Sequence, residues 1–395
     1  MRLTIVNGFF LPVPPVSGGS TEKTWHALGR AFAARGHEVV SISRRWSGFP
    51  REETEAGVRH LRLPGFDHQA KLSRNLFRDF RWSWRVFRAL PPADIVVCHA
   101  VTLPVWLGFL KPAAGRVVVM TGRMPKGQYR YYSHLTRVLA PSELVRERVL
   151  AENPALAPLI RTTGYPIDWS LLSQNDGTAP PFLPRRDPAE GVTIGFVGRL
   201  HREKGLLLLA EALKLLHAEP GLPPWQILLC GPSDTSRGGS GGEFRSRLLS
   251  QLSGAVDLSR LHVLEPQFNE RVLASIYRRI DVFCYPSLAE EGETFGVAVA
   301  EAMAAGAVPV VSHLACFRDF VRDGVNGLIF DHAGDGAAIR LAAVLRRVIM
   351  DATLRERLAL QARADVRQYD IPEFADRLLA DFAALTAVDP PPPRP

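Results

Sequence analysis

Two glutamates with a short, fixed spacing are the residues of this chain with the clearest chemical potential. Glu293 and Glu301 are separated by seven residues and flank the pair Phe295-Gly296. Two nearby carboxylates can act as a general acid and base, as in glycoside hydrolysis. They can also accept hydrogen bonds from vicinal hydroxyls such as those of a ribose or a hexose. Taken alone, Glu301 is more simply an ordinary helix residue and Glu293 a charge at a helix start, so the surrounding elements have to decide.

The elements around these glutamates favour a ligand site at a strand end. The apolar run 282–285 predicts a strand, 286–292 a loop, and 296–305 a helix that begins close to the end of that strand. Glu293 then lies in the loop and Glu301 inside the helix. The start of a helix after a parallel strand presents free backbone N–H groups and the positive end of the helix dipole, which suits a phosphate.

A second segment supplies fixed positive charge. After a predicted strand at 193–197 the chain reads Gly198-Arg199-Leu-His-Arg-Glu-Lys204-Gly205 and enters a helix. The guanidinium of Arg199 can bridge two phosphate oxygens, and Lys204 adds a point charge. A solvated loop is the plainer alternative for such a composition.

A third segment carries two adjacent glycines. Gly18 and Gly19 precede a predicted helix at 21–35. Glycines let backbone N–H groups approach an anion closely. The alternative is an ordinary loop in which Ser20 or Thr21 caps the helix.

Residues 286–312 read Pro-Ser-Leu-Ala-Glu-Glu-Gly-Glu-Thr-Phe-Gly-Val-Ala-Val-Ala-Glu-Ala-Met-Ala-Ala-Gly-Ala-Val-Pro-Val-Val-Ser. This stretch resembles the signature of glycosyltransferase family 4, whose members are retaining enzymes of GT-B fold that use nucleotide sugars. The resemblance implies that Glu293 contacts the hydroxyls of the donor sugar and that Glu301 holds the nucleotide ribose. It adds Thr294, Phe295 and Gly296 to the donor-binding residues.

The same family shows Gly-Arg-x4-Lys-Gly where this chain has Arg199 and Lys204, and a Gly-Gly pair where it has Gly18 and Gly19. The resemblance therefore implies that Arg199 and Lys204 grip the donor diphosphate and neutralise the leaving group, so that with Glu293 they are the expected catalytic residues. It places Gly18 and Gly19 near the donor phosphates. The residues expected to line the nucleobase pocket are Gly231, Gln267 and Phe268.

The chain departs from the family pattern in its first half. His99 ends a predicted strand at 95–98 and is expected to line the acceptor cleft. The next strand ends in Thr-Gly-Arg123, where related enzymes have a histidine that faces the reacting sugar. At 164–168 the usual Asn-Gly pair is missing, although Asp168 matches. These departures put a catalytic histidine in doubt and leave the role of Arg123 open.

The length of the chain and the alternation of strand-like and helix-like segments predict two α/β domains. The chain has 395 residues, of which 46% are hydrophobic, enough for two full cores. Strand-like and helix-like segments alternate, which predicts parallel sheets covered by helices. We expect a GT-B arrangement, with two Rossmann-like domains whose sheets face a central cleft. The predicted parts are a first domain at 1–175, a Ser/Pro/Gly-rich linker near 172–190, a second domain at 190–370 and a disordered proline-rich tail at 387–395. The family resemblance implies that the first domain binds the acceptor and the second the donor, and that a crossover helix near 371–386 completes the first domain.

The remaining composition bears on compartment and cofactors. The four cysteines stand singly in or beside apolar segments without metal-type spacing, as small core residues do in a reducing compartment. The first residues predict a strand rather than a signal peptide, and no apolar run is long enough to span a bilayer. We expect a cytoplasmic protein with no metal site and no tightly bound cofactor; the donor substrate would be a UDP-sugar or a GDP-sugar.

Charge is concentrated in the first half. Residues 1–175 hold 24 Lys+Arg against 12 Asp+Glu, and the rest holds 24 against 28. Residues 71–90 place arginines at helical spacings, with an apolar stripe of Leu76, Phe77, Phe80, Trp84 and Phe87. This helix either packs the stripe on its own domain or meets anionic lipid at the inner face of the cytoplasmic membrane, where a lipid-linked acceptor would lie.

The prediction is therefore a retaining glycosyltransferase (EC 2.4, hexosyl type) of cell-envelope polysaccharide, lipopolysaccharide or glycolipid synthesis. A nucleotide-sugar epimerase of the same fold would convert the donor without an acceptor, and the complete two-glutamate segment argues against it. A non-enzymatic polyanion-binding protein would fit the basic first half. No recognised RNA or DNA module supports nucleic acid as a partner, so glycan or lipid-linked acceptors are expected.

Overall fold

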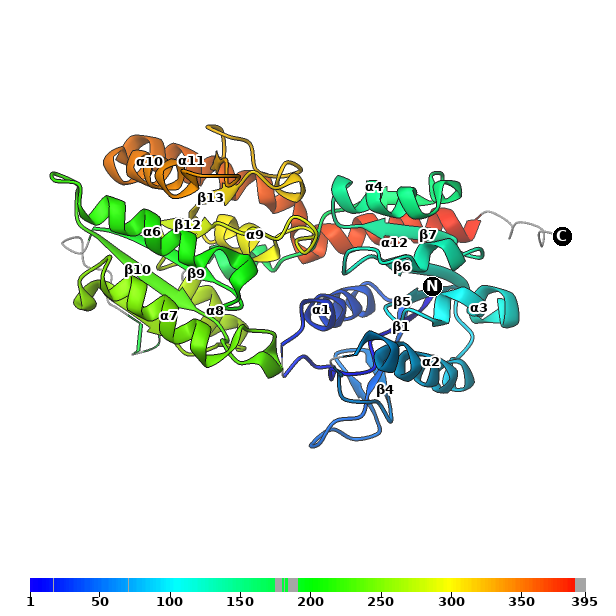
Figure 1. The fold of residues 1–395 in the computed structure, drawn as a ribbon. Helices are drawn as coiled ribbons and strands as arrows, with labels where there is room; N and C mark the ends of the chain where they lie inside the picture. Colours follow the sequence, from blue (N-terminus) through cyan, green and yellow to red (C-terminus); the bar gives the residue numbers. More distant parts are fainter. Residues whose placement is uncertain (17, 70, 175–179, 181, 184–190, 388–395) are drawn as a thin grey trace. The chain divides into compact units, whose positions relative to one another are not determined.

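The chain folds into two compact units. The computed structural model describes residues 1–16, 18–69, 71–174, 180, 182–183 and 191–387. The first unit consists of Met1–Pro166 together with helix α12 (Ile371–Ala387), and the second of Ile167–Asp370. Figure 1 shows strands and helices alternating along the chain in both units.

The first unit is built on an eight-stranded sheet within the described residues. Its strand order is β3-β4-β2-β1-β5-β6-β7-β8, and every neighbouring pair is parallel except β3 with β4. The central strands are short runs of buried aliphatic residues, as expected where helices cover both faces. The strands are β1 (Arg2–Val6), β2 (Glu38–Arg44), β3 (Glu52–Glu55), β4 (Val58–Leu63), β5 (Ile95–Cys98), β6 (Arg116–Met120), β7 (Arg137–Ala140) and β8 (Ile160–Thr162).

Helices cover both faces of this sheet. Helices α2 (Leu72–Ala89), α3 (Leu103–Leu110) and α4 (Glu143–Glu152) share one hydrophobic core with alternate residues of the strands. Helix α1 (Ser20–Ala34) lies on the opposite face, where Gly29 comes so close to the sheet that an added Cβ would be 3.3 Å from Ile5 Cδ1.

Helix α12 returns from the far end of the sequence to pack beside α1. The rings of Phe32 and Phe382 are 6.4 Å apart. Arg137 at the start of β7 forms a two-bond ion pair with Asp381, with the closer contact at 2.7 Å. The last helix therefore completes the core of the first unit.

A hairpin at the edge of the first sheet is absent from the sequence prediction. Strands β3 and β4 are joined by Ala56 and Gly57, which have φ values of 47° and 80°. A two-residue turn with positive φ at both positions matches the twist of an antiparallel hairpin. The residues of β3, Glu-Glu-Thr-Glu, show no alternation of apolar and polar side chains, so periodicity could not reveal the strand.

The second unit is a six-stranded parallel sheet among the residues described. Its order β11-β10-β9-β12-β13-β14 places β9 next to β12 at the centre. The strands are β9 (Val192–Val197), β10 (Trp225–Cys230), β11 (Leu261–Leu264), β12 (Val282–Tyr285), β13 (Val308–Ser312) and β14 (Leu328–Phe330). The helices are α5 (Trp169–Ser173), α6 (Leu206–His217), α7 (Gly241–Ser253), α8 (Glu270–Tyr277), α9 (Val297–Ala304), α10 (Ala337–Met350) and α11 (Ala352–Asp365).

The boundary between the units differs from the predicted one. The first unit ends at Pro166 rather than at 175, because the chain from Ile167 bonds to the second unit. Ile167 N donates to Tyr369 O at 2.9 Å, and Arg278 donates to Leu171 O at 3.0 Å. Most of the predicted linker, 172–190, lies outside the described residues, as do residues 388–395 of the predicted tail; Ala387 belongs to α12.

The Arg137–Asp381 pair generates a stability prediction. The Arg137 side chain is only 8% exposed, so Asp381→Ala leaves a buried cation without its partner and should destabilise the first unit by about 3 kcal/mol. Asp376→Ala, which removes the exposed partner of Arg35 from the same helix, should cost about 0.5 kcal/mol or less. Urea unfolding measures both; equal effects would show that α12 is not anchored through Asp381.

Candidate functional site

The site in the second unit forms where two neighbouring parallel strands end. Strands β9 and β12 pair in parallel, so their carboxyl ends lie at the same edge of the sheet. The loop after β9 carries Arg199 and Lys204, and the loop after β12 carries Glu293. The structure joins these loops directly, because Lys204 Nζ donates to Glu293 Oε2 at 2.7 Å.

Glu293 is a buried carboxylate held from one side. Its residue is 9% exposed, and Oε2 also accepts from the Tyr285 hydroxyl at 3.1 Å and from Ser287 Oγ at 3.3 Å. All three donors contact the same oxygen. Among the described residues no hydrogen bond is made to Oε1, which leaves that oxygen available to accept a hydroxyl from a ligand.

Local backbone geometry positions Lys204. The 3-10 helix Arg202–Lys204 ends at Gly205, which has φ 67° and precedes α6. A Cβ at this glycine would lie 1.9 Å from Pro286 O, so only glycine lets the loop come this close. Leu288 N donates to Glu203 O at 2.7 Å and fastens the two loops together.

Tyr285 supports the same cluster. Its ring lies 5.3 Å from Lys204 Nζ in a cation–π contact. Burial, and then the charge of Glu293, raises the pKa of Tyr285 well above its usual value. The hydroxyl therefore keeps its proton and remains a hydrogen-bond donor to Glu293.

Glu301 occupies a separate environment inside α9. It is 8% exposed, and its Oε2 accepts from the Tyr277 hydroxyl at 2.8 Å. Burial, followed by the charge of Glu301, raises the pKa of Tyr277 well above its usual value. The two glutamates thus have different hydrogen-bond donors.

The turn between the glutamates is fixed by an aromatic anchor. The Phe295 side chain is fully buried and stacks on Phe320 at 4.6 Å and against Tyr369 at 5.3 Å. Only the backbone of Phe295 can therefore meet a ligand. Thr294 is half-buried. Gly296 has φ 90° at the start of α9, where a Cβ would be 2.5 Å from the Phe317 ring.

Arg199 has partners that the sequence did not reveal. Its guanidinium donates to Gly238 O at 2.7 Å and to Glu203 Oε1 at 2.8 Å, and its side chain is 45% exposed. Each of the two cations predicted to grip a diphosphate is thus already paired with a carboxylate. Glu203 stands between them in the sequence, but the spacing alone did not indicate that its side chain would fold back onto Arg199.

The predicted nucleobase residues lie at the ends of β10 and β11. Gly231 meets the loop after β9, because its Cβ would be 1.8 Å from Gly198 O. Gln267 donates to the backbone oxygen of Glu265 at 3.1 Å. Phe268 is 41% exposed, and the Arg237 guanidinium lies 5.3 Å from its ring. The arginine was not foreseen; it forms, with Phe268, an exposed aromatic–cation surface.

In the first unit the predicted residues gather at the ends of three adjacent strands, β1, β5 and β6. Gly18 and Gly19 have φ values of 83° and 100° before α1. Arg123 is exposed, with its guanidinium 5.5 Å from the Phe10 ring. The positive charge of Arg123 acts on Glu22, so the end of β6 lies near the glycine loop.

Two further polar residues, Glu22 and His99, complete this edge. Glu22 is 5% exposed, and burial raises the pKa of its carboxyl; a Cβ at Gly19 would be 2.4 Å from its Oε2. The His99 ring lies 5.0 Å from Trp25, and burial lowers the pKa of His99 to about 3. His99 Nε2 has no hydrogen-bond partner in the described part of the chain. His99 is therefore a neutral, half-buried ring at physiological pH.

The stripe of helix α2 faces solvent. Four of its five predicted members are large exposed side chains: Leu76, Phe77, Phe80 and Trp84 are 42%, 63%, 50% and 49% exposed. The face of α2 that packs on the sheet is instead formed by Asp79, Trp82, Ser83 and Val86. Phe87, the fifth member, is half-buried and packs against the core of the first unit. The interpretation that the stripe packs on its own domain is therefore confirmed for Phe87 and wrong for the other four residues.

The described residues were also compared with the requirements of a membrane-spanning helix and of a metal site. No helix among them has both the length and the apolar character needed to cross a membrane. In the same residues, no group of three or more His, Cys, Asp or Glu side chains is arranged to hold a metal ion.

Two doubly wound parallel-sheet units define a protein of GT-B fold, and solved structures share it. A sucrose-phosphate synthase from Thermosynechococcus elongatus is similar with a TM-score of 0.77 at 21% identity, over 98% of this chain and 99% of that one. HepE from Anabaena, solved in complex with UDP and glucose, has a TM-score of 0.73 at 16% identity, over 97% of this chain and 100% of that chain.

Sequence comparison then identifies the family. The family model described as glycosyl transferases group 1 matches residues 185–365, and the one described as glycosyltransferase family 4 matches residues 18–158. The chain belongs to glycosyltransferase family 4.

Curated relatives match over a shorter region. A phosphatidyl-myo-inositol mannosyltransferase from Mycobacterium tuberculosis is 34% identical over 202 residues, covering 50% of this chain and 48% of that protein. A D-inositol 3-phosphate glycosyltransferase from Corynebacterium urealyticum is 33% identical over 201 residues, covering 50% of this chain and 44% of that protein. The match thus spans about half the length of these relatives.

The Lys204–Glu293 pair gives a double-mutant prediction. Lys204→Met leaves a buried carboxylate without its cation and should destabilise the second unit by about 3 kcal/mol. Adding Glu293→Gln removes the stranded charge and should restore more than half of that loss. Arg199→Met, which breaks the exposed pair with Glu203, should stay within about 1 kcal/mol. Urea midpoints test this, and a double variant as unstable as the sum of the singles would contradict a direct pair.

Proposed function

We propose that the protein is a retaining glycosyltransferase that moves a sugar from a nucleotide-diphosphate sugar to an acceptor hydroxyl. The observation that carries this proposal is the buried Glu293 carboxylate, held by Lys204 on one oxygen and open on the other. It stands at the strand edge where the start of α9 offers backbone N–H groups. Hydroxyl acceptors beside a helix start and a cation suit a sugar attached to a phosphate.

The donor diphosphate would replace an existing carboxylate partner of the cations. Arg199 and Lys204 would bind its oxygens, with Glu203 released from Arg199 because its ion pair is exposed and therefore weak. Glu293 would accept from the hydroxyls of the sugar, and Glu301 from the ribose. Phe268 beside Arg237 offers a surface for the base, uracil or guanine. The backbones of Thr294, Phe295 and Gly296 complete the donor set.

The proposed reaction keeps the configuration at the anomeric carbon. The bond between that carbon and the diphosphate oxygen breaks, and the acceptor oxygen forms its bond on the same face. The acceptor proton passes to an oxygen of the departing diphosphate. Because negative charge grows on that leaving group, Arg199 and Lys204 lower the barrier by stabilising it, and no tightly held metal is invoked.

The acceptor would be bound by the first unit. Gly18 and Gly19 offer backbone groups, and Arg123 supplies an exposed cation in the place where related enzymes carry a histidine. His99 is half-buried and neutral, so it would line the wall rather than transfer protons. The names of the curated relatives, which act on inositol lipids or inositol phosphate, support an acceptor of the cell envelope such as a glycolipid, lipopolysaccharide or polysaccharide precursor.

Location follows from the exposed stripe of α2. An aromatic face flanked by arginines is suited to the headgroup region of an anionic membrane. We therefore infer a cytoplasmic protein that attaches peripherally to the inner face of the cytoplasmic membrane, where a lipid-linked acceptor would be reached.

The donor assignment is tested with a panel of UDP-sugars and GDP-sugars. The true donor should raise the melting temperature, since a ligand that binds only the folded state stabilises it. With that donor, Glu293→Gln should lower kcat/KM for transfer at least about 100-fold, while affinity for the bare nucleoside diphosphate changes less than about 3-fold. Glu301→Gln should instead lower the affinity for the bare nucleoside diphosphate, because Glu301 is assigned to the ribose. Equal loss of both ligands in Glu293→Gln would show that this residue does not hold the sugar.

Membrane attachment is tested by flotation with vesicles. The protein should float with vesicles that contain phosphatidylglycerol and remain in the dense fraction with vesicles of phosphatidylcholine alone. Because the attraction is largely electrostatic, raising the salt concentration should reduce flotation. Absence from both floating fractions would refute the attachment.

A further inference from the structure

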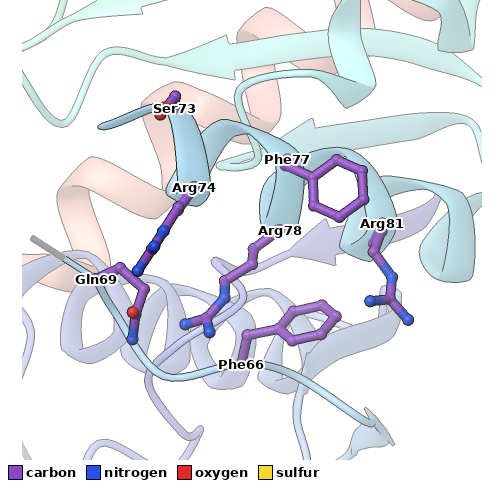
Figure 2. A pocket seen from close by; sticks show the side chains of 7 residues that line it. All are labelled: Phe66, Gln69, Ser73, Arg74, Phe77, Arg78 and Arg81. Carbon is purple, nitrogen blue, oxygen red and sulfur yellow. The ribbon is translucent and has the colours of Figure 1, made fainter. Parts of the chain in front are cut away.

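The outer face of α2 borders an open hollow of about 540 Å³ in the first unit. Figure 2 shows its lining: Phe66 lies below the helix, and the guanidinium groups of Arg74, Arg78 and Arg81 extend from the helix around the space above it. We propose that this hollow is a binding site for the phosphate of an anionic phospholipid headgroup. The proposal rests on the membrane-side function inferred above and assigns to it a specific site.

Three guanidinium groups converge on one aromatic ring. The guanidinium carbons of Arg78, Arg81 and Arg85 lie 5.9, 5.3 and 4.7 Å from the centre of the Phe66 ring. Arg81 is also 6.0 Å from the Phe77 ring. Cation–π contacts hold the three groups over one small region. Like charges gathered in this way repel one another, and a bound anion would relieve that repulsion.

The carboxylates of the same segment do not pair with this cluster. Residues 66–89 contain two acids, Asp67 and Asp79. Asp79 is 3% exposed and accepts hydrogen bonds from the backbone and hydroxyl of Thr102 beneath the helix. Asp67 pairs with Arg44 at 2.7 Å. Both acids are thus engaged elsewhere, and the outward face of α2 keeps its positive charge.

The arginines differ in the hydrogen bonds that they already make within the protein. Arg78 donates to Asp67 O and Arg85 to Pro64 O, so these two brace the chain below the helix. Arg81 makes ring contacts that leave its N–H groups able to donate to a ligand. Arg74 lines the same space from the exposed start of α2. Together with Ser73 and Gln69 they supply the donors that phosphate oxygens require.

The surroundings of the hollow favour a lipid over a free phosphate. Phe77 on its rim is 63% exposed, and Leu72 and Phe80 on the same helix are 61% and 50% exposed. Helix α3 packs beside α2 through the contact of Trp84 with Trp106. A soluble phosphate ester would leave these apolar side chains in water, whereas a phospholipid covers them with its glycerol and acyl region while its phosphate meets the arginines.

The test compares two single-charge changes on one helix. Arg81→Gln removes a residue of the hollow, and Arg88→Gln removes an exposed arginine of α2 that lies outside it. Binding of the full-length protein is measured with vesicles of equal parts phosphatidylglycerol and phosphatidylcholine, without any nucleotide sugar, so the result does not depend on glycosyl transfer. Arg74→Gln serves as a second variant of the hollow, and melting temperatures confirm that all variants fold.

A diffuse attraction predicts the same loss for every arginine, about 5-fold each. A phosphate site predicts that Arg81→Gln and Arg74→Gln lose at least about 10-fold more affinity than Arg88→Gln, because direct charge-assisted hydrogen bonds are lost as well. Equal losses in all three variants would overturn the site while leaving membrane attachment intact. If the protein bound soluble glycerol 3-phosphate and showed no preference for vesicles, the assignment of a phospholipid as the ligand would be overturned. Donor binding, measured separately, decides the glycosyltransferase assignment.

Discussion

The buried ion pair between Lys204 and Glu293 is the contact on which the site of the second unit depends. It ties the loop after β9 to the loop after β12, two segments that are nearly ninety residues apart in sequence. Parallel pairing makes the contact geometrically available, because adjacent strands end at the same edge. The Gly205–Pro286 approach makes it close enough. Once formed, the pair allows a carboxylate to stay buried where an unpartnered one would be costly.

The pair also changes how the positive charges of the site are understood. Arg199 and Lys204 are both engaged by carboxylates, but in different surroundings: the first pair is exposed and the second is buried. Exposed ion pairs exchange partners at little cost, whereas buried ones resist. The two cations are therefore suited to different tasks. In the proposed function, Arg199 would turn to an arriving diphosphate, and Lys204 would contact it while still orienting Glu293.

In the first unit, the two sides of helix α2 likewise have different surroundings. Trp82 and Val86 of α2 enter the core, and the buried Asp79 accepts hydrogen bonds from the segment before α3. The opposite side of the helix carries aromatic and arginine side chains into solvent. Exposed apolar patches of this kind on a protein usually mark an interaction surface. The outward face of α2 is thus available for binding without any demand on the core.

The sequence by itself determined the class of fold and most of the elements. The predicted strands at 282–285 and 137–140 coincide with strands found, because buried parallel strands are short, mostly apolar segments. The motif around Glu293 and Glu301 indicated the family because it lies within one contiguous stretch of sequence. Only the tertiary structure decided which groups meet. That Glu203 folds back onto Arg199, that Phe295 is an anchor, that the stripe of α2 faces solvent, and that residues 167–173 join the second unit all depend on contacts between distant segments. Periodicity reports which side of a helix is apolar, but packing against the rest of the chain decides which side is covered.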